Sequence, residues 1–230
     1  MSTFPTLPGF ANPVDDAQAV FRAVLAAFSR PGLSVPLSVL PPPLPVGGFS
    51  RGMLALALTL CDKDIPVWLD EAADTPEARH YLRFHCAAPF TVHAAEASFA
   101  FISQPKKMPR LQDFHPGQAK YPDRSATLVI SADLSSPQAH TLELTGPGVK
   151  GNDRDVWQSI CISGLPTWFW KDWEVNYAMY PLGVDVLLVD AGSSGDSPVR
   201  LMGLPRTTRV RPALNRPAGF LPSQEHAICM

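Results

Sequence analysis

A guanidinium and an imidazole lie close together in the segment Leu82-Arg83-Phe84-His85. Residues two apart in an extended chain point to the same side, so Arg83 and His85 would face one ligand if this segment is extended. Both side chains can donate hydrogen bonds to a phosphate or a carboxylate. We therefore predict Arg83 and His85 as ligand-binding residues, with internal pairing to Asp or Glu as the alternative.

A second cluster of donors follows Pro205, where a strand is expected to begin. It consists of Arg206, Thr207 and Thr208, whose guanidinium and hydroxyl groups suit a phosphate or a carboxylate. We predict these three residues as ligand-binding as well, and we expect any phosphate-bearing ligand to lie near them. Internal ion pairing of the arginine is again the alternative.

Four aromatic residues crowd together at Trp168, Phe169, Trp170 and Trp173. They cannot all face one core, and tryptophan is enriched where proteins bind one another. We predict an interface at Trp168, Trp170 and Trp173, in which one or two rings are exposed and the remainder pack in the core.

No motif for catalysis or metal binding stands out. Residues 146–151 match G-x-G-x-x-G, but their proline removes a backbone N–H that a pyrophosphate would need, so a tight turn is favoured. The histidines lack the spacing of metal ligands. Asp62 and Asp64 could act as paired carboxylates, although capping and turn formation are favoured. We expect no catalytic residue, no metal and no cofactor.

The composition favours one folded domain that meets other proteins. The chain has 230 residues, a formal net charge of −2 and 46% hydrophobic residues, which argues against disorder and against nucleic acid as a partner. Only 17% of the residues are charged, and a surface poor in charge favours an oligomer or a subunit. The N-terminus lacks the features of a secretory signal, and the longest apolar run is too short to span a membrane. We expect a cytoplasmic protein with reduced cysteines.

Hydrophobic periodicity predicts helices and short strands. The first helix is expected to open at Asn12-Pro13 and to close at Pro31-Gly32. One apolar face of this helix is expected to comprise Val14, Ala17, Phe21, Val24, Leu25 and Phe28. Further helices are expected at 53–61, 75–83 and 166–180, and strands at 65–69, 98–103, 126–131, 141–145, 184–189, 199–202 and 207–210. This order predicts one α/β domain with a mixed sheet at residues 1–210 and a loose tail at 211–230.

Several blocks of the sequence match a known family in their order and spacing. They are Pro13-Val-Asp-Asp-Ala-Gln18, Arg30-Pro31-Gly32, Pro66-Val67-Trp68-Leu69, Leu82-Arg83-Phe84-His85, Leu144-Thr145-Gly146-Pro147-Gly148, Pro181-Leu182-Gly183-Val184-Asp185 and Leu204-Pro205-Arg206-Thr207-Thr208. From about residue 10 to 210, the chain resembles the PhnH family, whose members are subunits of the bacterial carbon–phosphorus lyase machinery that degrades organophosphonates.

The resemblance implies a three-layer fold similar to the large domain of type I pyridoxal-phosphate-dependent transferases, without their cofactor site. It implies a subunit that is inactive alone. With the other carbon–phosphorus lyase subunits it would form alpha-D-ribose 1-methylphosphonate 5-triphosphate from ATP and a phosphonate. A homodimer in isolation and a phosphonate or nucleotide ligand are further expectations.

Two other functions remain open at this point. A small-ligand binding module would use Arg83, His85 and Arg206. A stand-alone pyridoxal-phosphate transferase would need a desolvated lysine to form a Schiff base, whereas the lysines of this chain lie in polar or turn contexts. They are Lys63, Lys106, Lys107, Lys120, Lys150 and Lys171.

Overall fold

The protein, represented by a computed structural model, is described here for residues 7–43, 46–134, 140–150, 157–190 and 198–213. Its central sheet has six strands: β1 (Val35–Pro36), β2 (Val67–Leu69), β3 (Phe99–Ile102), β4 (Thr127–Ser131), β7 (Asp185–Asp190) and β8 (Arg200–Leu204). They lie in the order β1-β8-β7-β4-β3-β2. β2, β3, β4 and β7 run parallel, whereas β8 and β1 are antiparallel to their neighbours. The predicted α/β domain with a mixed sheet is confirmed.

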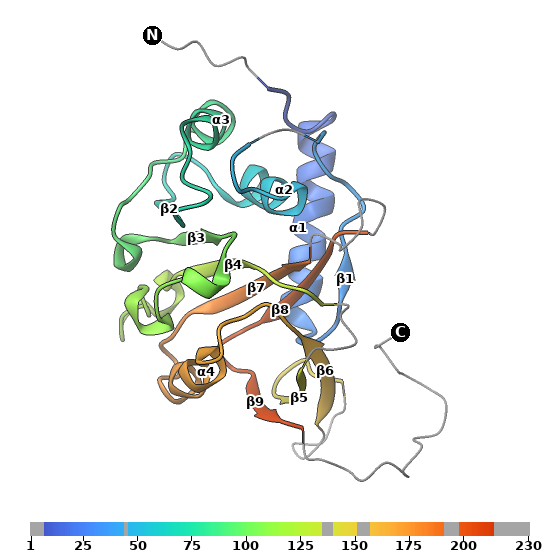
Figure 1. Cartoon of the computed structure of the whole chain (residues 1–230), viewed down its shortest axis with the longest axis vertical. Coiled ribbons are helices and arrows are strands. Elements are labelled where there is room, and N and C mark those ends of the chain that lie inside the picture. The colour runs from blue at the N-terminus through green and yellow to red at the C-terminus, as the bar shows by residue number, and fades with distance from the viewer. Residues whose placement is uncertain (1–6, 44–45, 135–139, 151–156, 191–197, 214–230) are drawn as a thin grey trace.

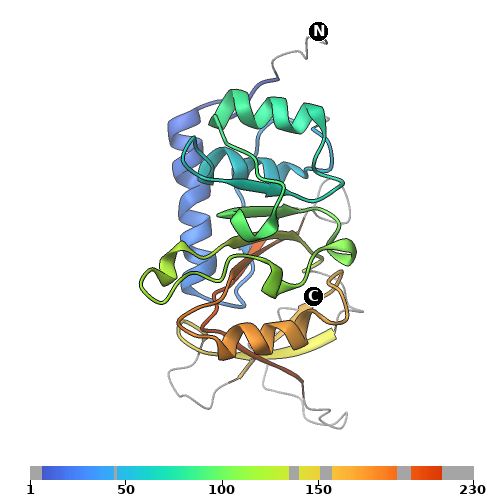
Figure 2. The ribbon, with the colours of Figure 1, turned by 90° about the vertical axis from the view of Figure 1, so that its left-hand side faces the viewer.

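Further elements cover both faces of this sheet, as Figure 1 and Figure 2 show. On one face lie the helices α1 (Pro13–Ser29), α2 (Arg51–Leu60) and α3 (Pro76–Cys86). On the other lie α4 (Phe169–Ala178) and an antiparallel sheet of β5 (His140–Thr145), β6 (Gln158–Ile162) and β9 (Arg209–Pro212). Short 3-10 turns complete the chain: η1 (Ala94–Glu96), η2 (Pro105–Lys107), η3 (Leu111–Asp113) and η4 (Pro122–Arg124).

Each face of the central sheet has its own hydrophobic core. In β4, Val129 packs with the helices of one face, while Leu128 and Ile130 pack with α4 and the second sheet. Successive side chains of a strand point to opposite faces, so a strand covered on both sides must be apolar throughout. This explains the almost unbroken apolar run at 184–189, which predicted a strand where β7 lies.

Helix α1 packs directly against β8 through a glycine. A Cβ atom at Gly203 would lie 2.6 Å from the backbone oxygen of Ala27 and 2.8 Å from the backbone nitrogen of Phe28. Both contacts are to backbone atoms, which cannot move aside by changing a rotamer. Gly203 therefore sets the close distance between the helix and the sheet.

The buried face of α1 differs from the predicted one. Val20, Val24 and Ala27 are the buried residues of this helix. Val14, Phe21 and Leu25 are exposed by 82%, 46% and 51%. The expected apolar face therefore does not coincide with the buried face at these three residues, since helical periodicity finds an apolar stripe without showing what the stripe contacts. We call Val14, Phe21 and Leu25 the α1 stripe.

Both edges of the central sheet are short or covered. β1 has two residues, one of which is Pro36. At the other edge, residues 89–91 lie along β2: the Val67 N–H donates to the Pro89 carbonyl at 2.9 Å, and the Thr91 N–H donates to the Val67 carbonyl at 3.0 Å. This pairing fixes the position of Phe90, which forms a bridge with Val67.

Two other predictions about the backbone need correction. The tail was expected to begin at Arg211, but β9 pairs with β5 as far as Pro212, because Pro212 lies opposite Leu142 in the second sheet. β6 was not predicted, although it pairs with β5 over five residues. The rest of the predicted tail, residues 214–230, lies outside the described residues.

The predicted turn at Gly146 is confirmed. The Val149 N–H donates to the Gly146 carbonyl at 3.2 Å, and Gly148 has a φ of 82°, a conformation that glycine adopts most readily. Asp62 likewise shapes a turn, since its carboxylate accepts a hydrogen bond from the Asp64 N–H at 2.8 Å.

Three cysteines belong to the described part of the chain. Cys61 and Cys86 are free thiols, as predicted, whereas Cys161 is disulfide-bonded, which corrects the expectation for that residue. Burial raises the pKa of the Cys86 thiol to about 11. None of the described helices is long and apolar enough to cross a membrane.

Candidate functional site

Helix α3 carries the first predicted cluster. The Thr75 hydroxyl caps the first turn by accepting a hydrogen bond from the Ala78 N–H at 3.2 Å. The helix continues to Cys86 and ends where Ala87 adopts a left-handed conformation, with a φ of 54°. The predicted end near Arg83 was too early, and the segment that follows is helical rather than extended.

The helical geometry separates Arg83 from His85. Residues two apart on a helix differ by about 200° around its axis, so their side chains leave on nearly opposite sides. His85 Nε2 lies 2.9 Å from the Leu7 carbonyl oxygen, and its ring packs 4.4 Å from that of Tyr81. His85 thus links the chain at Leu7 to α3. The prediction that Arg83 and His85 share one side is wrong, because it required an extended chain.

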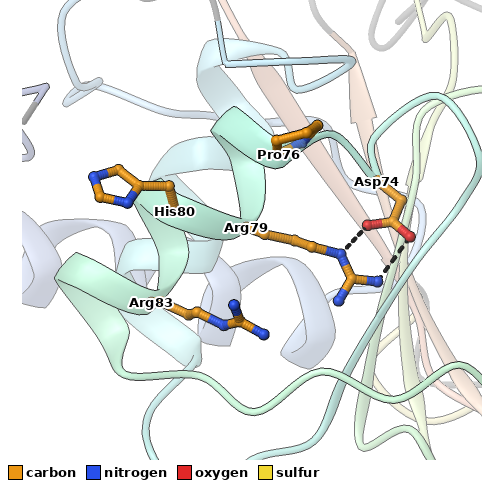
Figure 3. Close-up of a pocket in the computed structure, with 5 residues that line it drawn as sticks. All are labelled: Asp74, Pro76, Arg79, His80 and Arg83. Carbon is orange, nitrogen blue, oxygen red and sulfur yellow. Dashed lines mark hydrogen bonds and ion pairs between the residues drawn. The ribbon is translucent and has the colours of Figure 1, made fainter. Parts of the chain in front are cut away.

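Arg83 instead shares a side of α3 with Arg79, one helical turn away, as Figure 3 shows. Both guanidinium groups lie over the ring of Phe90, at 5.4 Å and 4.9 Å from its centroid. The two arginines line a pocket of about 450 Å³. The other lining residues are Asp74, Pro76 and His80.

This pocket has an excess of positive charge. Arg79 donates from Nε and Nη2 to the two carboxylate oxygens of Asp74, at 2.8 Å for Nη2. These hydrogen bonds raise the pKa of the Arg79 guanidinium above its ordinary value, so the group stays charged. Within the described ranges no carboxylate pairs with Arg83. Asp74 therefore balances one of two guanidinium charges, and the pocket suits an anion.

The sequence contained a signal for this pair that the prediction did not use. Thr75-Pro76 is a typical helix start, and Arg79 and Arg83 are four residues apart after it. Treating the whole segment as helical would have placed both arginines on one face. The position of Phe90 under them depends on pairing with β2, which no local pattern indicates.

The second predicted cluster has a different environment. All three guanidinium nitrogens of Arg206 donate hydrogen bonds within the chain. Nε donates to Asp185 at 3.2 Å, and Nη2 donates to Asp185 and to the Ser125 hydroxyl. Nη1 donates to the Pro122 carbonyl at 2.9 Å and to the Pro181 carbonyl at 3.3 Å. The Arg206 side chain is 11% exposed. A ligand could reach this guanidinium only by displacing one of these partners, so Arg206 mainly joins the segments around the amino ends of β4 and β7.

Thr208 lies in the interior of the protein, close to the hydrogen-bond network of Arg206. Its N–H donates to the Pro205 carbonyl at 2.8 Å, and its own carbonyl accepts a hydrogen bond from Trp173 Nε1 at 2.9 Å. Thr208 is fully buried, whereas Thr207 is partly exposed. The structure therefore does not bring the two predicted clusters together. Arg83 lies on α3, whereas Thr208 is bonded to Trp173 of α4, and these two helices lie on opposite sides of the central sheet (Figure 1).

The aromatic cluster at α4 divides between surface and core. Trp173 is fully buried, so it packs in the core and offers no surface to a partner. Trp168 and Trp170 are partly exposed, and the Arg110 guanidinium lies 4.7 Å from the ring centroid of Trp168. Arg110 also bonds the carboxylate of Asp172, which holds the pKa of that buried carboxyl below its ordinary value.

The chain is thus, by fold and site, a mixed-sheet α/β domain with an arginine-lined pocket on its outer helix layer. No group of three His, Cys, Asp or Glu side chains in the described part of the chain is placed to hold a metal ion. Residues 8–211 match the sequence model of the family described as bacterial phosphonate metabolism protein (PhnH). The chain belongs to the PhnH family, and the resemblance expected from the ordered sequence blocks is confirmed.

Two relatives extend this result. The chain is 37% identical over 202 residues to the alpha-D-ribose 1-methylphosphonate 5-triphosphate synthase subunit PhnH of Rhizobium meliloti (strain 1021), covering 87% of this chain and 93% of the relative. It is 29% identical over 199 residues to the putative C-P lyase subunit protein HtxG of Stutzerimonas stutzeri, covering 84% of this chain and 85% of that protein.

Proposed function

We propose that this chain is a subunit of a carbon–phosphorus lyase complex that degrades organophosphonates. The observation that carries the proposal is the 37% identity to a named synthase subunit over 93% of that relative's length. A match over nearly the whole length indicates that the two chains share one fold. In such a complex the chain would serve the formation of alpha-D-ribose 1-methylphosphonate 5-triphosphate from ATP and a phosphonate, in the cytoplasm.

In this proposal the chain has no enzymatic activity of its own. All six lysines lie in the described residues and are exposed. A stand-alone pyridoxal-phosphate transferase would need a lysine amine shielded from water, so this alternative is disfavoured. The similarity to the large domain of such transferases remains a prediction.

Co-expression with the neighbouring subunits tests the complex. We expect the tagged chain to elute with them in fixed stoichiometry and to convert no ATP or methylphosphonate alone, whereas the assembled subunits do. The measurements are size-exclusion chromatography and phosphorus NMR of the reaction mixture. Turnover by the isolated chain, or its elution without partners, would contradict the proposal.

Trp168 and Trp170 are proposed to belong to a partner surface at α4. Exposed side chains continue the apolar surface along this helix, since Val175 is 46% and Tyr177 is 38% exposed. In the co-expression experiment, Trp168→Ala with Trp170→Ala should reduce the yield of the complex. Trp157→Ala is the matched control, because Trp157 is also partly buried but packs under Arg211 in the second sheet.

We also propose that the isolated chain forms a homodimer. The α1 stripe supports this, because three large apolar side chains on one helix are exposed to water in the single chain. Phe21→Glu with Leu25→Glu should shift the chain to a monomer if this surface is the contact, since carboxylates are costly to bury. Light scattering measures the mass, and Gln118→Glu in an exposed turn is the control. An unchanged dimer would exclude the α1 stripe, and a monomeric unaltered chain would overturn the homodimer.

A further inference from the structure

We propose that the pocket on α3 binds a phosphorus oxyanion, the charged group shared by phosphates and phosphonates, with Arg83 as its principal binding residue. The site is argued from its geometry. Only the choice of methylphosphonate and ATP as probes rests on the proposed function.

The guanidinium of Arg83 is available to a ligand. In the described part of the chain this guanidinium forms no ion pair, and it lies over the Phe90 ring, 5.4 Å from the ring centroid. A guanidinium stacked on a ring keeps its N–H donors free in its own plane. Arg83 is exposed, so these donors are accessible from solvent.

The aromatic ring beneath the two guanidinium groups has a fixed position. Phe90 is held between two backbone hydrogen bonds to Val67, one from each side of the ring residue, at 2.9 Å and 3.0 Å. The arginines above it project from a capped helix. Side chains of the protein that project from rigid elements lose less entropy when a ligand binds, which favours affinity for a small anion.

The two arginines differ in the hydrogen-bond donors that they leave to a ligand. Asp74 occupies Nε and Nη2 of Arg79, while Nη1 is in none of the hydrogen bonds found among the described residues. Among the described residues, Arg79 therefore keeps one donor group free, and Arg83 keeps its full set. A tetrahedral oxyanion has oxygens outside a single plane and can accept from both, whereas one carboxylate is satisfied by one guanidinium.

The size of the pocket agrees with a small ligand. Its volume of about 450 Å³ lies within the roughly 300–1,000 Å³ typical of small-molecule sites. Asp74 has a second effect, since its charge repels an anion that approaches Arg79. Removing this carboxylate should therefore strengthen binding rather than weaken it.

Titration calorimetry of the purified full-length chain at low salt tests the site, with inorganic phosphate, methylphosphonate, ATP and acetate as separate probes. We expect binding of at least one phosphorus oxyanion, weaker at higher salt. Arg83→Gln should reduce its affinity about ten- to hundredfold, as expected for charge-assisted hydrogen bonds. Arg22→Gln on α1 is the matched control, with the same change of charge at an exposed arginine that bonds Gln18.

Asp74→Asn should have the opposite effect to Arg83→Gln and raise the affinity of the pocket for the same probe. Comparing the phosphorus probes shows whether a free phosphate, a phosphonate or a nucleotide is the preferred source. The proposal is overturned if no phosphorus probe binds, if Arg83→Gln binds as tightly as Arg22→Gln, or if acetate binds as tightly as phosphate. Because Arg83 is exposed, thermal melts of its variant should match the unaltered chain. Failure of binding leaves co-elution with partner subunits unaffected, so the two proposals fail separately.

Discussion

Replacing Arg206 with alanine should destabilise the chain by about 3–5 kcal/mol, the range observed when one partner of a buried ion pair is removed. The substitution leaves the Asp185 carboxylate without its cation and frees the carbonyls of Pro122 and Pro181 from a donor. For a chain of this length each kcal/mol lowers the melting temperature by about 2–4 °C. Calorimetry should therefore record a drop of roughly 10 °C.

A matched control lies three residues further along the chain. Arg209 is exposed and contacts the ring of Trp157 at 5.9 Å, so Arg209→Ala should change the melting temperature little. Combining Arg206→Met with Asp185→Asn should recover part of the loss, because the pair is then removed without an uncompensated charge. Equal melting temperatures for Arg206→Ala and Arg209→Ala would contradict the structural role of Arg206.

The second large effect is expected at Gly203, where α1 touches β8. Gly203→Ala places a methyl group against the backbone of Ala27 and Phe28, so the helix must move away from the sheet. Overpacking of this kind costs about 3 kcal/mol. Denaturant unfolding measures the change in the free energy of unfolding.

Gly52→Ala on α2 is an informative comparison for this substitution. A Cβ there would also meet an atom at 2.6 Å, but that atom belongs to the Val199 side chain, which can rotate. Alanine also favours a helix over glycine by about 1 kcal/mol, which offsets the crowding. If Gly203→Ala proved no more harmful than Gly52→Ala, the close contact between α1 and β8 would not be a constraint on the fold.

The strands were predictable where both faces of the sheet are covered. β7 and β4 appear in the sequence as short runs of apolar residues, a pattern that follows from burial on both sides. β6 was missed because its strand, Gln158–Ile162, alternates between partly exposed and buried positions and includes polar residues. β1 has two residues and depends on pairing with β8, so no local pattern reveals it.

In the candidate site, too, the local sequence shows the residue types, whereas their contacts depend on residues distant in the sequence. The residue types of Arg83 and Arg206 suggested donors for an anion, but the availability of these donors depends on residues far away in the sequence. Arg206 is occupied by Asp185, which precedes it by 21 positions. The Arg83 guanidinium lies over the ring of Phe90 only because the segment around Phe90 pairs with β2. Exposure of the α1 stripe likewise depends on which side of the helix the sheet occupies.

The edges of the central sheet restrict how a neighbour can attach. An exposed edge strand invites another chain to add a strand through backbone hydrogen bonds. Here one edge strand, β1, has two residues, one of which is a proline, and residues 89–91 occupy the other edge along β2. Recognition must then rely on side chains, whose identity evolution can vary, rather than on the peptide backbone common to all proteins. Such a surface can distinguish between the partner proteins of an assembly, and it resists non-specific polymerisation.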